Sequence, residues 1–320
     1  MCNYIVTNSE IGSAEQDLFD NGQYFNSEQK MFIKCLDSCC LQAYAGTGKT
    51  SAIVGKLHVL AQKNIWKNGR GICVISHTNV AVDEIKKHVA KHYPGIMEYP
   101  NFVGTIQEFA NKFLFIPYLA SKGLQIKFQD SYRYNDYKNE ITDLSIIRRI
   151  DNKLAQLNHS RDKARAKEEF FKRFQTLHLN NGHLFAEDNN NGLTVYNDLE
   201  TKQVSQRCIV EALSTLIKKQ HEKGVFLFLE SFVYGYAYLK QNLLLKDIIS
   251  QRFEFAFLDE AQDCSEIQLN VLYELFGETQ RLYFNKLAIL TRLLPKQNGR
   301  LPILGISLSQ CGLGKTSQVL

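Results

Sequence analysis

The 320-residue sequence lacks a long apolar run. Its most apolar stretch, residues 225–239 (VFLFLESFVYGYAYL), is shorter than the roughly 20 residues that a bilayer-spanning helix needs, and it contains Glu230. The first residues also lack a basic segment followed by an apolar one, so we expect no signal peptide. These absences predict a soluble, cytoplasmic protein.

Cysteine patterns typical of metal sites are lacking as well. The chain has eight cysteines but no C-x-x-C pair, and no second cluster lies at a metal-ligand spacing from Cys35, Cys39 and Cys40. Cys39, Cys40 and Cys73 lie in short apolar runs, where a free cysteine behaves as a small buried hydrophobic side chain. We therefore expect structural cysteines and no cysteine-based metal site.

A strong net charge is also absent. The formal charge of +5 is weak evidence for a polyanionic partner. The distribution is more informative, because residues 145–175 contain nine Lys or Arg against four Asp or Glu. Such a run is typical of a solvated helix face, and also of a surface that contacts phosphates. The sequence leaves both interpretations open.

Apolar segments alternate with segments of helical spacing along much of the chain. The candidate strands are residues 38–44, 71–76, 100–104 and 253–258, and helical patterns follow at 49–63 and 79–93. Thr105 and Glu108 have the spacing of a capping box, which predicts a further helix start. Residues 1–24 are polar and aperiodic, and we expect a flexible lead-in there. The alternation predicts an α/β fold with a parallel sheet.

Residues 120–245 interrupt this alternation. Apolar residues between positions 141 and 157 recur at helical spacing, and further helical patterns follow a turn-rich segment at 187–192. We interpret residues 120–245 as an α-helical insertion within the α/β domain.

A glycine-rich loop, AYAGTGKT, lies between the first strand and the first long helix. Gly46 and Gly48 permit a tight wrap around phosphate oxygens, Lys49 supplies a cation, and the Thr50 hydroxyl suits Mg²⁺. The helix that opens at Lys49 adds its positive dipole end. The strict Walker A pattern has glycine where this chain has Ala43. The candidate nucleotide-binding residues of the loop are Ala45, Gly46, Thr47, Gly48, Lys49, Thr50 and Ser51.

An acidic pair ends the strand at 253–258. In the sequence FLDEAQD, Asp259 follows four apolar residues, and Glu260 comes next. Because a carboxylate oxygen is a ligand that Mg²⁺ prefers, we expect Asp259 to hold the ion with Thr50. A water that attacks the γ-phosphate needs a base nearby, and we expect Glu260 to polarise it.

These two motifs together resemble those of the superfamily 1A (UvrD/Rep/PcrA-like) DNA helicases. Four further stretches match the family in the same order: FNSEQKMFI at 25–33, SHTNVAVDEI at 76–85, GTIQEF at 104–109 and LLLKDIISQRFEFAFLDEAQD at 243–263. The resemblance covers roughly residues 25–276. The wording of residues 71–114 is also similar to the helicase-like subunit of Gabija-type antiphage systems.

The resemblance implies roles for residues at the matching positions. Gln29 would read the adenine edge, Thr78 and Asn79 would contact single-stranded DNA, and Thr105 and Phe109 would belong to a second DNA-contacting motif. In the DEAQD box, Gln262 would couple the γ-phosphate state to the DNA cleft. With Lys49 and Glu260, Gln262 completes the expected catalytic set. The implied cofactors are ATP and Mg²⁺, and the implied partner is single-stranded DNA or a single/double-strand junction.

The same resemblance implies a domain plan. Residues 25–119 and 246–278 would form a RecA-like P-loop NTPase domain (1A), and residues 120–245 would be the helical 1B insertion. In residues 279–320 we recognise none of the family's motifs III–VI, and this segment is too short for a second RecA-like domain. It is explained equally by a truncated start of domain 2A, by a shifted reading frame or by a lineage-specific ending. A second GLGKT match at 312–316 is read as chance.

We therefore predict an ATP-binding, UvrD-like helicase chain that lacks part of the catalytic machinery. The expected activity is ATP hydrolysis coupled to translocation on DNA or to unwinding. One alternative is a catalytically silent nucleotide-binding subunit of a DNA-processing or antiphage complex, with a second protein supplying the missing RecA-like domain. Another is an unrelated P-loop ATPase or kinase.

Overall fold

The computed structural model describes the chain in the following ranges: residues 5–19, 22–36, 39–41, 48–64, 69–131, 178–180, 183–187, 193–195, 205–276, 283–286 and 308–310. Only the backbone is described for Lys49, Gln262, residues 205–213 and the strands within 39–41, 178–195, 283–286 and 308–310. The chain forms two compact units, which we describe separately. The first comprises residues 1–109, 242–264 and 268–320, and the second comprises residues 110–241 and 265–267.

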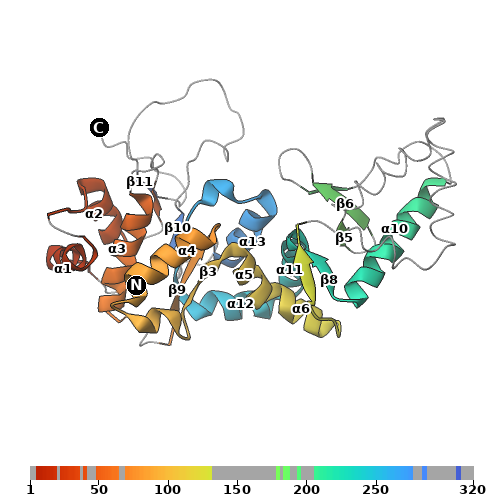
Figure 1. The fold of residues 1–320 in the computed structure, drawn as a ribbon, viewed down its shortest axis with the longest axis horizontal. Helices are drawn as coiled ribbons and strands as arrows, with labels where there is room; N and C mark the ends of the chain where they lie inside the picture. Colours follow the sequence, from red (N-terminus) through yellow and green to blue (C-terminus); the bar gives the residue numbers. More distant parts are fainter. Residues whose placement is uncertain are drawn as a thin grey trace, which may run out of the picture. The chain divides into compact units, whose positions relative to one another are not determined.

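The first unit is an α/β structure built on one six-stranded sheet (Figure 1). In sheet order the strands are β11 (Leu308–Gln310), β1 (Cys39–Leu41), β10 (Tyr283–Lys286), β9 (Phe253–Leu258), β2 (Gly71–Ser76) and β3 (Phe102–Thr105). Its helices are α1 (Asn8–Leu18), α2 (Ser27–Lys34), α3 (Lys49–Gln62), α4 (Asn79–Ile85), η2 (Lys86–Ala90), η3 (Pro94–Met97), α5 (Ile106–Ala110), α12 (Leu243–Arg252), η5 (Ala261–Asp263) and α13 (Glu266–Phe276). All strand pairs are parallel except β1 with β11. The expected parallel sheet flanked by helices is confirmed.

Two central strands carry the core of this sheet. Every residue of β2 (GICVIS) is buried, and so is every residue of β9 (FEFAFL) except Glu254. Continuous apolar runs of this kind are typical of parallel strands covered on both faces. Cys73 in β2 is buried, as expected from its apolar run, and this burial raises the pKa of its thiol. Cys73 is therefore a packing residue.

Residues 8–18 form helix α1, which our expectation of an aperiodic lead-in missed. Its buried residues include Ile11 and Ala14, which pack in the same cluster as α2 and α3. Helices α1, α2 and α3 lie side by side in Figure 1. With so few apolar residues, α1 has too weak a periodicity to be recognised from sequence.

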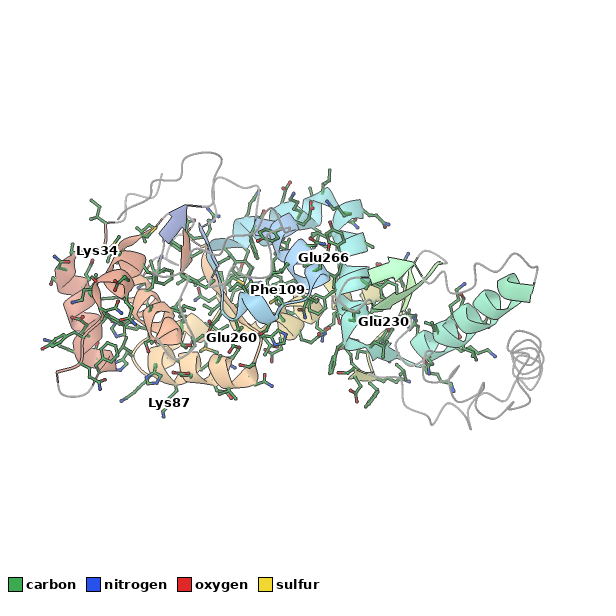
Figure 2. The ribbon with its side chains drawn as sticks, turned by 90° about the horizontal axis from the view of Figure 1, so that it is seen from above. Lys34, Lys87, Phe109, Glu230, Glu260 and Glu266 are labelled. Carbon is green, nitrogen blue, oxygen red and sulfur yellow. The ribbon has the colours of Figure 1, made fainter. Side chains whose placement is uncertain are left out.

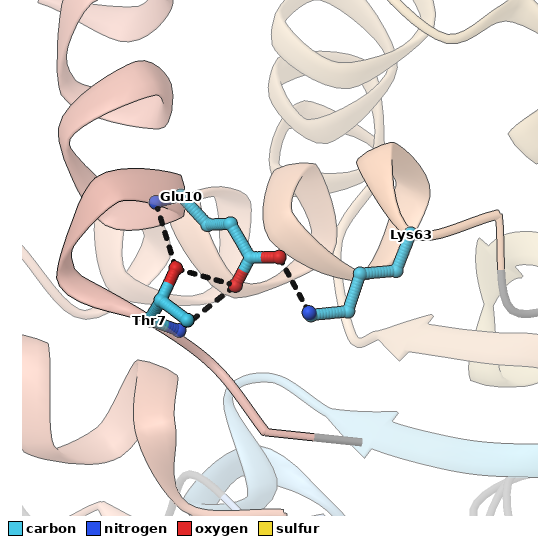
Figure 3. A network of polar contacts seen from close by, with 3 residues as sticks. All are labelled: Thr7, Glu10 and Lys63. Atoms are coloured by element: carbon cyan, nitrogen blue, oxygen red, sulfur yellow. Dashed lines mark hydrogen bonds and ion pairs between the residues drawn. The ribbon is translucent and has the colours of Figure 1, made fainter.

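Polar contacts cap the start of α1 and connect α1 to the end of α3 (Figure 3). Thr7 and Glu10 form a reciprocal capping box, and Glu10 also pairs with Lys63 at the end of α3. Burial raises the pKa of the Glu10 carboxyl, but Lys63 and Thr7 outweigh this effect and the net pKa is lowered. The lowered pKa means that ionised Glu10 stabilises the folded state, and that this contribution is lost as the pH falls through the folded pKa.

Helix α3 is joined closely to the segment that carries α2. The Lys56 side chain is completely buried, and its Nζ donates to the carbonyl oxygens of Phe32, at 3.1 Å, and Cys35. These carbonyls lie at the carboxyl end of α2, where the helix dipole favours a cation. Directly before Lys56, Gly55 leaves room for the Phe25 ring, because a Cβ on Gly55 would lie 2.3 Å from Phe25 Cζ. Two residues of α3 thus hold residues 25–35 in place.

The second unit contains helices and short strands. Its elements are η4 (Asn111–Phe115), α6 (Ile116–Ser121), β4 (Phe128–Asp130), β5 (His178–Asn180), β6 (His183–Glu187), β7 (Leu193–Val195), α10 (Ser205–Glu222), β8 (Val225–Leu227) and α11 (Phe228–Gln241). Strands β4 and β8 pair in parallel, and β5, β6 and β7 form an antiparallel sheet. The expectation of a purely helical insertion is therefore corrected: these strands have three to five residues each, too few to show a period of two.

A buried acid organises the described core of the second unit. Glu230 is fully buried; its Oε2 accepts the backbone N–H of Leu227 at 2.8 Å, and its Oε1 lies 3.1 Å from Nε2 of His221. The ring of His221 stacks on Phe226, which packs with Phe115.

Among the residues that the structure describes, no helix is long and apolar enough to span a membrane.

Replacement of glycine by alanine should have opposite effects on stability at Gly55 and at Gly12. The reason is that Gly55 closely approaches Phe25, whereas the space around Gly12 is open. Gly55→Ala should lower the free energy of unfolding by about 1–3 kcal/mol, because the new methyl group overlaps a buried ring. Gly12→Ala in α1, where an added Cβ would meet no atom within 4 Å, should raise it by about 0.5–1 kcal/mol. Urea unfolding curves measure both values, and a stabilising Gly55→Ala change would contradict the packing described here.

Candidate functional site

The polar loops of the first unit leave the sheet at one edge. Residues paired in register across the parallel strands are Cys40, Lys286, Leu258, Ile75 and Gly104. Because the strands run in the same direction, the residues that follow this row all emerge at the carboxyl edge. These are Leu41 at the end of β1, Asp259 after β9, and the segment after β2. Ligands bind at this edge in open α/β sheets.

Part of the predicted phosphate loop lies outside the described residues. Ala45, Gly46 and Thr47 belong to this part, and the side chains of Lys49 and Gln262 are likewise not described. The described portion begins at Gly48, where α3 starts. Thr50 and Ser51 lie half-buried in the first turn of α3.

Gly48 is the N-cap of α3 and adopts a left-handed conformation, with φ 79° and ψ 32°. It makes no side-chain cap, so the first N–H groups of α3 are left for another acceptor. A Cβ on Gly48 would lie 2.7 Å from Nε2 of Gln29. The backbone conformation therefore favours glycine here, and an added Cβ would also displace the end of the Gln29 side chain. A helix start of this kind favours an anion.

Gln29 joins α2 to this helix start. Its Oε1 accepts the backbone N–H of Asn26 at 2.9 Å, while Asn26 Oδ1 accepts the N–H of Gln29 at 2.8 Å. Its Nε2 donates to the carbonyl oxygen of Gly48 at 3.0 Å. The oxygen and the nitrogen of the Gln29 side-chain amide thus both make hydrogen bonds. The capping box at Asn26 could have been found in the sequence, because N-S-E-Q has the required spacing; the contact with Gly48 could not.

Asp259 and Glu260 lie next to β2. The backbone N–H of Asp259 donates to the carbonyl of Ile75 at 2.8 Å, and the Asp259 residue is 2% exposed. Its Oδ1 accepts the N–H of Glu260 at 3.0 Å. Glu260 has φ 55° and ψ 38°, a left-handed conformation that is uncommon for a residue with a side chain. Such backbone strain concentrates at functional sites.

Thr78 contacts Glu260 directly, which the sequence did not predict. Its Oγ1 donates to Oε2 of Glu260 at 3.2 Å and accepts the N–H of Ala81 at 3.3 Å, so it also caps α4. Asn79, the next residue, is exposed. Glu260 is labelled in Figure 2. The segment expected to contact DNA therefore touches the expected catalytic acid.

Thr105 and Phe109 lie in the core. The capping box is confirmed, since Thr105 N–H donates to Glu108 Oε2 at 2.7 Å and Glu108 N–H donates to Thr105 Oγ1 at 3.2 Å. Phe109 is 1% exposed, and its ring lies 5.5 Å from that of Phe102 and 6.0 Å from that of Phe276 (Figure 2). Both residues pack α5 against the sheet in this structure.

Two oxygen donors of the first unit suit a hard divalent cation. The hydroxyl group of Thr50 and the buried carboxylate of Asp259 offer the oxygen ligands that Mg²⁺ prefers. The other candidate features of the sequence, the basic run at 145–175 and the second GLGKT at 312–316, lie outside the described residues.

Comparison with known proteins agrees with this geometry. The family model described as UvrD/REP helicase N-terminal domain matches residues 25–285. The match begins at the segment of Gln29 and ends within β10, so it includes every described residue of the candidate site. A search of the curated proteins gives no match.

The contact between Gln29 and Gly48 predicts the effect of Gln29→Glu. A glutamate at this position keeps the acceptor for the Asn26 N–H but replaces the donor at Gly48 with a carboxylate oxygen. The first turn of α3 should then open more easily, by about 1–3 kcal/mol. Hydrogen exchange at the amides of residues 52–54 should be correspondingly faster.

Asn26→Asp is the matched control, because it retains the cap and leaves the Gln29 amide unchanged. It should exchange at the wild-type rate. Unchanged protection in Gln29→Glu would show that the contact does not support the start of α3.

Proposed function

The chain belongs to the UvrD/REP helicase family, and from this premise we propose that it binds ATP with Mg²⁺ and couples ATP hydrolysis to movement on single-stranded DNA or a single/double-strand junction. The observation that carries the proposal is the register of the sheet, which brings Asp259–Glu260 and Thr78 to the edge at which β1, the strand before the phosphate loop, also ends. A nucleotide at the phosphate loop and DNA at the segment after β2 would then share the acidic pair between them.

In this proposal the nucleotide lies against the start of α3. The residues that hold it are Gln29, Ala45, Gly46, Thr47, Gly48, Lys49, Thr50 and Ser51. The N–H groups of the first turn and the Lys49 ammonium group neutralise the phosphate charge. Thr50 and Asp259 are the Mg²⁺ ligands, and the ion, when bound, offsets the charge of the phosphate oxygens.

Glu260 is the proposed base. Its carboxylate accepts a proton from the water that attacks the γ-phosphate. The Thr78 hydroxyl occupies Oε2 of this carboxylate at 3.2 Å. We propose that DNA contact at Thr78 and Asn79 loosens this hydrogen bond and so links DNA binding to hydrolysis. Gln262 would follow the state of the γ-phosphate.

Gln29 is proposed to read the adenine edge. Since both ends of its amide are engaged by Asn26 and Gly48, adenine must share or replace one of these bonds. Nucleotide binding at Gln29 would therefore change the hydrogen bonding at the start of α3.

The proposed DNA surface includes Thr78 and Asn79, both exposed at the start of α4. Thr105 and Phe109 would contribute by positioning the helix that follows β3, since their side chains are buried. Phosphate contacts by the basic residues at 145–175 would make DNA binding sensitive to salt.

We propose the family's domain plan for this chain. Residues 25–119 and 246–278 correspond to domain 1A, and residues 120–245 correspond to 1B. Hydrolysis in such enzymes is accelerated by an arginine that stabilises the charge on the transferred phosphoryl group. Motifs III–VI are not recognised in residues 279–320, and we propose that a second protein supplies that arginine. A nucleotide-binding subunit of a DNA-processing or antiphage complex, with no turnover of its own, is the second candidate.

Substitution of Lys49 and Glu260 separates binding from hydrolysis. Lys49→Ala should abolish binding of a fluorescent ATP analogue, because the phosphates lose their cation. Glu260→Gln should bind the analogue normally but hydrolyse ATP at least about 100-fold more slowly, since the proton acceptor is lost. The isolated chain should already turn over slowly; unaltered affinity in Lys49→Ala would refute the phosphate-loop assignment.

Thr78→Val tests the link between the DNA segment and Glu260. Without the hydroxyl, the carboxylate is free in the absence of DNA, so the ratio of DNA-stimulated to basal single-turnover hydrolysis should fall at least about threefold. Thr78→Ser retains both hydrogen bonds and is the control. Equal ratios in Thr78→Val and in the unmodified protein would show that the hydrogen bond from Thr78 to Glu260 does not link DNA binding to hydrolysis.

A further inference from the structure

Three potential metal ligands converge on the first unit, away from the nucleotide site. Asp17 lies near the end of α1, His58 lies within α3, and His92 lies in the turn after η2. One ligand atom of each residue lies within 4.8 Å of the other two. The cluster therefore joins three segments that are separate along the chain.

His58 is the unusual member of this cluster. Its side chain is completely buried, yet neither ring nitrogen has a hydrogen-bond partner among the described residues. Nε2 lies 3.0 Å from Oδ2 of Asp17, at the distance of an ion pair, and Nδ1 has no hydrogen-bond partner among the described residues. A buried polar group without a hydrogen bond is costly and calls for an explanation.

We propose that Asp17, His58 and His92 bind a zinc ion. Two imidazole nitrogens and one carboxylate oxygen are a ligand set that zinc uses, and Mg²⁺ prefers an all-oxygen set. Zinc bound to a ring nitrogen of His58 supplies the buried imidazole with the partner that it lacks. The exposed side of the cluster leaves the fourth position of a tetrahedral ion to water.

The distances among the three ligand atoms allow zinc binding after small movements of the side chains. Ligands about 2.1 Å from a tetrahedral zinc ion lie about 3.3–3.5 Å from one another. The widest separation here is at most 4.8 Å, so it must shrink by about 1.5 Å or less. Asp17, whose side chain is 39% exposed, and the exposed His92 have the freedom to rotate toward His58.

The zinc site is distinct from the nucleotide site. His58 lies eight residues after Thr50 on α3, which corresponds to about 12 Å along the helix axis. A zinc ion would fasten α1 and the turn after η2 to the helix that begins at the phosphate loop. The proposal does not depend on ATP or DNA binding.

The test is zinc titration of the reduced, metal-free chain by calorimetry. The chain should bind zinc at this site, and Asp17→Asn and His92→Gln should each weaken that binding at least about tenfold, since even the loss of a group that only orients a ligand costs about this much. Both substituted side chains are exposed, so the fold should persist. His88→Gln, one turn before His92, is the matched control and should bind as the unmodified chain does.

Cobalt distinguishes this site from binding by cysteine. Co²⁺ in the site should give the visible bands of a tetrahedral ion without a thiolate charge-transfer band, and these bands should disappear in His92→Gln. Equal zinc affinity in all variants, a thiolate band or no zinc binding would each overturn the proposal. Asp17→Asn should still bind the ATP analogue, so a failure of the nucleotide site is recognised separately.

Discussion

Backbone pairing between β9 and β2 determines where the acidic pair Asp259 and Glu260 lies. The pairing of Leu258 with Ile75, continued by the hydrogen bond from Asp259 to Ile75, places Asp259 and Glu260 beside the segment that starts at Thr78. A shift by one residue would turn each side chain of β9 to the opposite face of the sheet. The buried Phe255 and Phe257 side chains oppose such a shift, so core packing and site geometry depend on the same register.

Helix α3 makes the contacts on the side of the proposed nucleotide site. Gly48 begins the helix in a left-handed conformation, and Gln29 holds its carbonyl oxygen. Farther along, Gly55 accommodates Phe25, and Lys56 binds the end of α2. The start of α3 is therefore coupled to residues 25–35 through packed side chains. The cluster at His58 adds a connection to α1 on the same helix.

Local patterns in the sequence predicted much of the first unit. The apolar run of β2, the helix after Gly48 and the Thr105–Glu108 capping box were all recognisable, because each depends on residues close together in the chain. The bond between Thr78 and Glu260 joins residues 182 positions apart, and no local pattern encodes it. Helix α1 and the strands β5–β7 were missed because their apolar residues are too few to show a period. The convergence of Asp17, His58 and His92 likewise appears only in three dimensions.

The central claim is that one edge of the sheet serves both nucleotide and DNA. Titration of the chain with Mg²⁺ and a non-hydrolysable ATP analogue, with and without a single-stranded oligonucleotide, tests it most directly. The account predicts one nucleotide per chain, with an affinity that changes at least about fivefold when DNA is present, because coupled sites share free energy. Binding with the same affinity in both conditions, or no nucleotide binding at all, would contradict it.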